Sequence, residues 1–191
     1  MYIVPFMNKR LAPLLGKLYL EAEGQPLKTF AGANPPFEMI QTWVSNRATQ
    51  DAADVRVEIR WHRDGKDIPI RGDTPGAWCP SRAPGIQSFS GPPTDAATLG
   101  SNGKRHHLGL LVKYPGQQDA YIVTEHGFQM GNPRWVIPSL ALPPGRYEAE
   151  IMFTASGGKT GSFRMSVWND GANGTIGCDV VPKSTLRSIK P

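Results

Sequence analysis

Cysteine is scarce in this sequence, since Cys79 and Cys178 are the only two among 191 residues. One disulfide could join them, but a chain of this length buries enough apolar surface to fold without a cross-link. Lys17 interrupts the apolar residues near the start too early for the core of a secretory signal. We therefore expect two buried thiols and a cytoplasmic location.

Long apolar runs are also missing. No stretch approaches the roughly 18 uninterrupted apolar residues that a membrane span requires, so the sequence predicts a soluble protein or the soluble part of a larger one. Neither a long amphipathic helix nor an internal repeat is evident. Glycine and proline are abundant instead, with 21 Gly and 18 Pro. Such frequent turn-forming residues favour many short strands.

Charge is sparse and mixed in sign. Charged residues make up 19% of the chain, and the net charge of +5 raises the question of a polyanionic partner. Basic residues gather only at Lys104–His107 and, in the tail, at Lys183, Arg187 and Lys190. A nucleic-acid-binding protein usually carries a denser basic stripe with stacking aromatic residues. Nucleic acid is therefore only weakly supported as a partner.

No phosphate-binding or paired-carboxylate motif is complete. Gly157–Thr160 has the letters that end a P-loop, but the first glycine of that motif would fall at Phe153, and a strand pattern follows where a helix is needed. A hairpin turn is the better interpretation. Glu58, Glu148 and Glu150 alternate with apolar residues, which places them on solvated faces rather than in a site for glycoside hydrolysis.

Histidine and cysteine form no metal-binding pattern. His106 and His107 are adjacent, so on a strand they point to opposite faces and cannot chelate one ion together. The sequence contains no His-x-His and no Cys-x-x-Cys spacing. Cys79 would need a histidine brought close by folding to act as a nucleophile, and nothing near it in the sequence marks that role. We expect no catalytic residue, no cofactor and no metal.

The clearest structural signal is Val55–Trp61, in which apolar residues alternate with Arg56, Glu58 and Arg60. Successive side chains of a strand point to opposite faces, so this pattern predicts one buried and one solvated face. Asp64-Gly65 follows and favours a tight hairpin turn. We expect strands at Lys17–Glu23, Phe37–Ser45, Val55–His62, Asp67–Arg71, His106–Tyr114, Asp119–Glu125, Arg146–Ala155 and Ser162–Trp168.

These strands, about eight in number, predict an all-β fold of the antiparallel β-sandwich type, with a jelly-roll or a partly closed barrel as alternatives. A barrel is favoured if the last strand pairs with the first. We expect an N-terminal arm at residues 1–16, the sandwich at 17–168 with a long loop at 72–105, and a Gly/Asn-rich, then basic tail at 169–191. Loops of that length are usually functional or disordered.

The five tryptophans are informative because an exposed indole on a sandwich can stack on a sugar. Trp43 and Trp61 lie on alternating positions that predict burial in the core. Trp78 and Trp135 lie in expected loops, where they either form a binding platform or pin the loops to the sandwich, and pinning is the commoner role. Trp168 ends a strand and fits either the core or the surface.

Three segments together carry a series of strand and turn motifs. They are Trp43–Ala48, Ala52–Ile59 and Leu142–Ile151, which contain Val-x-Asn, Ala-x-x-Val-x-Val and Leu-x-Pro-Gly-x-Tyr respectively. In this pattern the chain resembles bacterial immunoglobulin-like domains of the CARDB kind over residues 17–168. The resemblance implies an immunoglobulin-like sandwich with a binding or scaffolding role and supplies no catalytic residue. The insertion at 72–104 and the tail depart from it.

These features predict a non-enzymatic protein-interaction or scaffolding module whose partner is another protein or further copies of itself. We expect the contact surface at Gly72–His107, because that segment is long, has aromatic residues and ends in basic ones. The candidate contact residues are Trp78, Arg82, Phe89, Lys104, Arg105, His106 and Trp135. The alternatives are a carbohydrate-binding module or jelly-roll hydrolase, and a viral or assembly subunit with basic termini.

Overall fold

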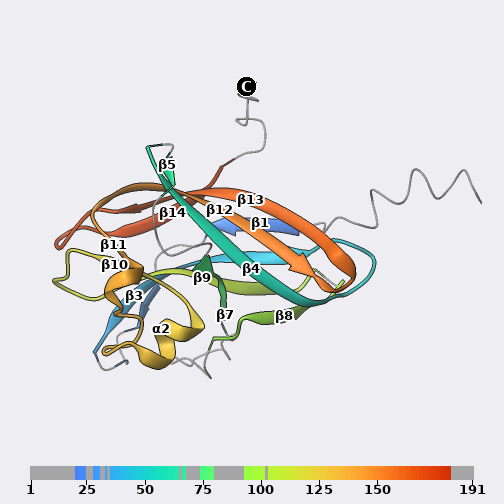
Figure 1. The fold of residues 1–191 in the computed structure, drawn as a ribbon, viewed down its shortest axis with the longest axis horizontal. Helices are drawn as coiled ribbons and strands as arrows, with labels where there is room; N and C mark the ends of the chain where they lie inside the picture. Colours follow the sequence, from blue (N-terminus) through green and yellow to red (C-terminus); the bar gives the residue numbers. More distant parts are fainter. Residues whose placement is uncertain are drawn as a thin grey trace, which may run out of the picture.

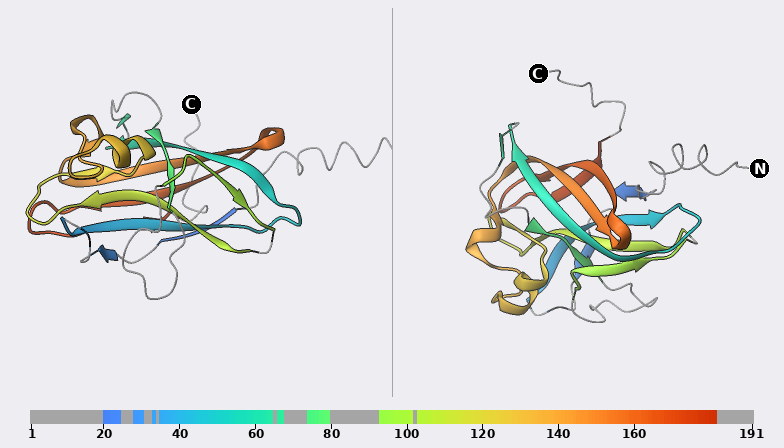
Figure 2. Two further views of the ribbon diagram at one scale, coloured as in Figure 1. Left: turned by 90° about the horizontal axis from the view of Figure 1, so that it is seen from below. Right: turned by 45° about the vertical axis from the view of Figure 1, so that its right-hand side comes forward.

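The computed structural model describes residues 20–24, 28–30, 33, 35–64, 66–67, 74–79, 93–101 and 103–181, and the structural statements below concern these residues. They form two antiparallel sheets that pack face to face, and the path of strands in neither sheet closes into a barrel. Figure 2 shows the two layers edge-on, with β4 and β12 in one and β3 and β9 in the other. The predicted all-β sandwich is confirmed.

We name the layers sheet I and sheet II (Figure 1). Sheet I follows the order β1-β3-β9-β10-β11, with β2 beside β3 and β7 beside β9, and sheet II follows β14-β13-β12-β4-β5, with β6 and β8 beside β4. The strands of sheet I are β1 (Leu20–Gly24), β2 (Lys28–Phe30), β3 (Phe37–Asn46), β7 (Ala77–Cys79), β9 (Arg105–Lys113), β10 (Ala120–Ile122) and β11 (Ala141–Leu142). The strands of sheet II are β4 (Ala52–Arg63), β5 (Lys66–Asp67), β6 (Thr74–Pro75), β8 (Ala96–Leu99), β12 (Gly145–Ala155), β13 (Lys159–Asn169) and β14 (Ile176–Val180).

β4 has the alternation that the sequence predicts. Val55, Val57, Ile59 and Trp61 are at most 2% exposed and face the core between the sheets. Ile59 is the register partner of Ile151 on β12, which buries its own alternate residues in the same core. Fully burying an aliphatic or aromatic side chain of this size contributes about 1.5–3 kcal/mol, so this row is a main source of stability.

The predicted hairpin after β4 is confirmed. Arg63 pairs with Lys66, which leaves a turn of two residues. Asp64 has a φ of 52°, the left-handed conformation that a two-residue turn of this hand requires. The rest of the expected return strand, to Arg71, lies outside the described residues.

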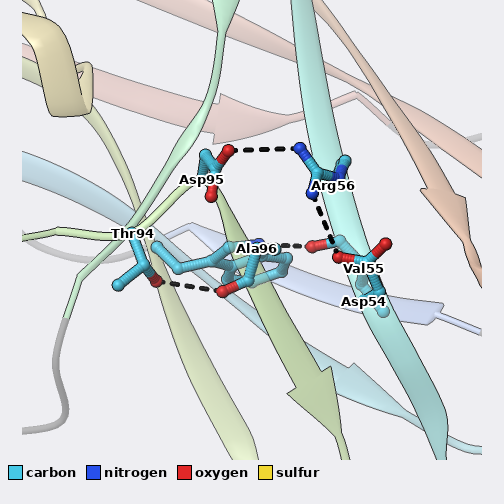
Figure 3. Close-up of polar contacts among 7 residues, drawn as sticks. Asp54, Val55, Arg56, Thr94, Asp95 and Ala96 are labelled. Atoms are coloured by element: carbon cyan, nitrogen blue, oxygen red, sulfur yellow. Dashed lines mark hydrogen bonds and ion pairs between the residues drawn. The ribbon is translucent and has the colours of Figure 1, made fainter.

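The expected loop at 72–105 contains three short strands. β6 pairs with β4, β7 pairs with β9, and β8 pairs with β4. Trp78 Nε1 donates a hydrogen bond of 2.8 Å to the Val55 carbonyl and so fastens β7 to sheet II. Beside this bond, Arg56 lies 3.2 Å from Asp95 and 3.4 Å from Asp54 (Figure 3). Strands of two to four residues are too short to show a period in the sequence, so they were not predicted.

Two segments nearer the end of the chain also differ from expectation. β14 pairs with β13, with Cys178 opposite Val167, so the sandwich continues into the expected tail. The expected strand Asp119–Glu125 stops at Ile122 and is followed by α2 (Glu125–Met130). Thr124 caps this helix, because its hydroxyl oxygen accepts a 2.8 Å hydrogen bond from the Gly127 amide. A short 3-10 helix spans Pro138–Leu140.

The β12–β13 connection is the predicted hairpin turn, not a P-loop. Ala155 pairs with Lys159, and a short 3-10 turn (Ser156–Gly158) joins them. Gly157 and Gly158 have φ values of 78° and 72°, which glycine adopts without a steric penalty. A strand follows the turn, so no helix N-terminus is available to bind phosphate.

A second apolar cluster lies on the face of sheet I that points away from sheet II. Phe37 and Met39 of β3 belong to it, whereas Ile40 and Val44 of the same strand belong to the core between the sheets. Residues 125–137, which we name the cover segment, pack on this second cluster and bring Trp135 into it. Both faces of β3 are therefore covered, which explains why residues of both parities are apolar.

Candidate interaction site

The seven predicted contact residues are divided between the surface and the interior. Lys104 and Arg105 are exposed where β9 begins, and His106 is half-buried. Trp78 is 4% exposed and Trp135 is 0% exposed, so neither indole belongs to a surface in the folded chain. Arg82 and Phe89 lie outside the described residues. Of the predicted residues that the structure describes, Lys104 and Arg105 are therefore the ones that lie at the surface.

Trp78 is a core residue that anchors the chain. Besides donating its hydrogen bond to Val55, it packs against Phe153 with ring centroids 6.1 Å apart. It thus connects β7 of sheet I to both central strands of sheet II. Pinning, rather than platform formation, is the role the structure gives this side chain.

Trp135 has a comparable role on the other face of sheet I. Its ring lies 5.4 Å from Phe37 and 5.2 Å from Phe128, measured between centroids. Its backbone has a φ of 65°, a costly conformation for a bulky residue, and its amide donates a 2.7 Å hydrogen bond to the Gly127 carbonyl. Packing and this bond hold the residue, so the indole fastens the cover segment to sheet I.

An aromatic and polar group, not predicted from the sequence, lies beside the exposed Arg105. The Arg105 guanidinium carbon is 4.0 Å from the ring centroid of Trp43, and the His107 ring is 5.4 Å from the indole at an interplanar angle of 73°. His107 Nδ1 is 3.2 Å from Gln41 Oε1. We name Gln41, Trp43, Arg105 and His107 the Trp43 cluster.

Strand register explains why these four side chains meet. β3 and β9 are antiparallel, and Trp43 is the register partner of His107 while Ser45 is the partner of Arg105. Residues two apart on a strand share a face, so Gln41 joins Trp43, and Arg105 joins His107. Trp43 is half-buried on this outer face. The prediction that it belongs to the core is therefore wrong, because residues of both parities on β3 are apolar and the pattern does not identify the inner face.

The Trp43 cluster combines a flat aromatic ring with a fixed positive charge. A guanidinium over an indole within about 6 Å is a favourable cation–π contact that also orders both side chains. On the other side of Trp43, β1 pairs with β3 so that Glu23 is the register partner of Trp43 and Glu21 the partner of Ser45. The described side chains of this surface thus combine an ordered aromatic pair with a positive charge.

His106 points to the inner face of sheet I and is not part of the cluster. It is the register partner of Val44, and its ring lies 6.3 Å from that of Trp78. Its Nε2 atom is buried and has no hydrogen-bond partner among the described residues. Burial, with a smaller effect from Lys104, lowers the pKa of His106 below its usual value. A neutral, packed ring of this kind contributes to the fold rather than to a contact surface.

Cys79 is a packing residue. It is 5% exposed and belongs to the second apolar cluster, and a Cβ atom placed on Gly109 would come within 2.9 Å of its sulfur. The thiol therefore lies over Gly109, and it donates a long, weak hydrogen bond to the Ala77 carbonyl at 3.9 Å. Cys178 is likewise a buried thiol. The expectation of two buried thiols is confirmed.

The acids considered for hydrolysis are held in ion pairs on the outer face of sheet II. Arg164 lies 3.1 Å from Glu148 and 3.2 Å from Glu150, and Glu150 is also 3.9 Å from Arg60. Both carboxylates are therefore engaged by guanidinium groups on a partly exposed face of the sheet. This arrangement supports a solvated charged face.

The buried Lys113 ties the two sheets together. Its ammonium donates to Asn169 Oδ1 at 2.9 Å, to the Gly174 carbonyl at 3.1 Å, and to the carbonyl of Gly171. Burial lowers its pKa, although the charges of Glu38 and Asp170 oppose that effect. One acceptor from the end of β13 and two from the β13–β14 connection surround the ammonium, so this lysine has a structural role and offers no nucleophile to solvent.

Neither a metal-binding group nor a membrane-spanning helix occurs in the described part of the chain. No three residues of the types His, Cys, Asp and Glu are grouped so that they could hold a metal ion there. Across the same residues, no helix has both the length and the apolar composition needed to cross a bilayer.

No protein-family model matches this chain, and neither the curated proteins nor the solved structures include one that is significantly similar to it.

Proposed function

We propose that this chain is a non-enzymatic interaction or scaffolding module built on an immunoglobulin-like sandwich, and that it binds another protein or a further copy of itself through the Trp43 cluster and Lys104. The observation that carries the proposal is the Arg105 guanidinium stacked 4.0 Å from the ring centroid of Trp43 on the outer face of sheet I. Trp and Arg are among the residues that supply most binding energy at protein interfaces.

The order of strands supports the immunoglobulin-like part of the proposal. In a constant-type domain, strands A to G form one sheet in the order ABED and a second in the order CFG. With β1, β3, β4, β7, β9, β12 and β13 taken as A to G, the pairs β1–β3, β3–β9 and β9–β7 match the first sheet, and β4–β12 and β12–β13 match the second. β2, β5, β6, β8, β10, β11 and β14 are then additions.

Two residues at expected places in such a domain add support. Tyr147 stands near the start of β12, the equivalent of strand F, and its hydroxyl donates to the carbonyl of Pro143 upstream. This is the geometry of a tyrosine corner. Trp61, on the equivalent of strand C, is 2% exposed in the core between the sheets.

The resemblance to bacterial immunoglobulin-like domains implies a bacterial source, and the buried thiols accord with a cytoplasmic location. Two cysteines that are not bridged suit a reducing compartment, because secreted domains of this size commonly use disulfides. The basic residues are scattered along the chain, which favours a protein partner over nucleic acid, because nucleic acid would require a denser positive surface.

The test is affinity capture with the full chain from a lysate of the source organism, followed by direct binding measurements with each purified protein retained. We expect Trp43→Ala and Arg105→Ala to weaken binding by about tenfold or more, which corresponds to ~1.4 kcal/mol or more. Arg56→Ala is the charge-matched control, since Arg56 is exposed on sheet II. Equal affinity of wild type, Trp43→Ala and Arg105→Ala for every retained protein would remove the Trp43 cluster as the contact surface.

A further inference from the structure

Trp168 lies on the outer face of sheet II, on the opposite side of the sandwich from the Trp43 cluster. It is half-buried near the end of β13, between Arg146 on β12 and Gly177 on β14, which are its register partners. A Cβ atom placed on Gly177 would come within 2.2 Å of Trp168 Cζ2 and 2.5 Å of Cε2. The six-membered ring of the indole therefore lies directly over the Gly177 backbone.

The absence of a side chain at residue 177 determines this position. Any larger residue would displace the indole from β14, so glycine permits the ring to rest on the sheet itself. On the other side, the Arg146 guanidinium carbon is 5.7 Å from the ring centroid, close to the outer limit of about 6 Å for a cation–π contact, and the ring remains partly exposed. Arg105, by comparison, is 4.0 Å from Trp43.

Hydrogen-bonding groups occupy the next row of the sheet. Glu148, Ser166 and Asp179 are register partners across β12, β13 and β14, two residues from the row that contains Trp168. Side chains two apart on one strand share a face, and diagonal neighbours on adjacent strands lie about 7–8 Å apart. A sugar ring stacked on the indole would thus have carboxylate, hydroxyl and guanidinium groups around its edge.

We propose that Trp168 is the stacking platform of a binding site for a neutral glycan. The apolar face of a pyranose ring packs on an aromatic ring that is held flat and open on one side, and its hydroxyls both donate to carboxylates and accept from a guanidinium. Around the platform, Arg146 and Arg164 stand beside Glu148 and Asp179, so the rim carries charges of both signs rather than the dense positive surface that a phosphate-rich ligand requires. The charges around the platform therefore favour a neutral sugar over a nucleic acid, although the bases of a nucleic acid could also stack on the indole.

This site is independent of the proposed protein contact, since the two lie on different sheets and share no residue. The platform is formed by three neighbouring strands. β12 pairs with β13 along its whole length, and β13 pairs with β14 from Met165 to Asn169. The platform therefore rests on regular strands, which hold side chains more rigidly than loops do.

The test is titration of the full chain with soluble hexasaccharides of β-1,4-linked glucose, xylose and N-acetylglucosamine, followed by calorimetry and by chemical shifts of the indole N–H groups. We expect at least one neutral glycan to bind and to shift the Trp168 resonance. Trp168→Ala should weaken that binding about tenfold or more, and Gly177→Val, which displaces the indole without removing it, should weaken it as well. Trp43→Ala is the control and should bind like wild type.

Two results would overturn the proposal. One is that no neutral glycan binds at millimolar concentration while the protein is folded by circular dichroism. The other is glycan binding that Trp168→Ala leaves unchanged. Single-stranded RNA serves as the charged comparison, and its binding in place of glycan would also contradict the assignment. Since Trp168→Ala leaves the Trp43 cluster intact, failure here would not affect the protein-contact proposal.

Discussion

The outer faces of the two sheets differ in what lies over them. On sheet II the exposed rows are charged, and Arg164 joins Glu148 and Glu150 at 3.1 and 3.2 Å. On sheet I, part of the outer face is apolar and is covered by residues 125–137, whose Trp135 is fully buried. A strand that alternates apolar and charged residues needs a packing partner on one face. β3 is apolar on both faces, so it needs a packing partner on each.

The same difference separates the two half-exposed indoles. Trp43 on sheet I is stacked by a guanidinium and lies beside an imidazole, while Trp168 on sheet II rests on a glycine and has a more distant guanidinium, at 5.7 Å. An ordered Arg–Trp pair suits contact with a protein of matching shape and charge. A partly exposed indole with polar neighbours suits stacking with a sugar ring.

The largest expected effect is that of Trp135→Ala. Removing this buried ring from the second cluster should lower the free energy of unfolding by about 3–5 kcal/mol, the usual cost of emptying such a site. Trp168→Ala, on the open face of sheet II, should cost about 1 kcal/mol or less. Urea denaturation followed by circular dichroism measures both. Similar losses for the two variants would mean that the cover segment does not form a second core.

Tyr114→Phe tests how the cover segment is fastened. The Tyr114 hydroxyl donates a 2.7 Å hydrogen bond to the Arg134 carbonyl, and its loss should cost about 0.5–1.5 kcal/mol at neutral pH. Burial raises the pKa of Tyr114 from 10.0 to about 12. The folded state thus favours the neutral phenol, and this contribution is complete below pH 10.0 and is lost as the pH rises toward about 12.

The measurement is the free energy of unfolding in urea from pH 9 to 12. Wild type should lose stability across that window, and Tyr114→Phe should lose less. Part of the loss should remain in the variant, because burial also raises the pKa values of Tyr121 and Tyr147. Identical slopes for the two proteins would exclude Tyr114 as a buried, titrating group.

The smallest expected effect is that of Arg164→Ala on sheet II. Its ion pairs are partly exposed, and exposed pairs contribute about 1 kcal/mol or less. The difference from wild type should also shrink in high salt, because salt screens charges at the surface. Urea titrations at low and high sodium chloride give both quantities. A loss as large as that of Trp135→Ala, independent of salt, would show that this face is buried in some assembly.

The sequence was sufficient to predict elements that have a clear period. β4 alternates through Val55, Val57, Ile59 and Trp61, and Asp64, which follows the strand, has the positive φ that a tight hairpin needs. β12 and β13 carry the same kind of pattern. In these strands local preference and tertiary burial agree, so the pattern identifies both the strand and its inner face.

The remaining features depend on contacts that no local pattern encodes. β6 and β7 are too short for a period, and α2 begins at a cap, Thr124, inside what looks like a continuing strand. Trp43 was misassigned because Phe37 and Met39, which share its parity, are buried by the distant cover segment. The Trp43 cluster could have been anticipated only by noting that Arg105 and His107 share a parity on β9.

The most direct test of this account is the accessibility of the five tryptophans to hydroxyl-radical oxidation, measured residue by residue with mass spectrometry on the native chain. Both proposed sites require one reachable indole on each outer face, and the two-core architecture requires the other three to be inside. We predict rapid modification of Trp43 and Trp168 and protection of Trp61, Trp78 and Trp135. Modification of Trp135 as fast as Trp168, or protection of Trp43, would contradict the account.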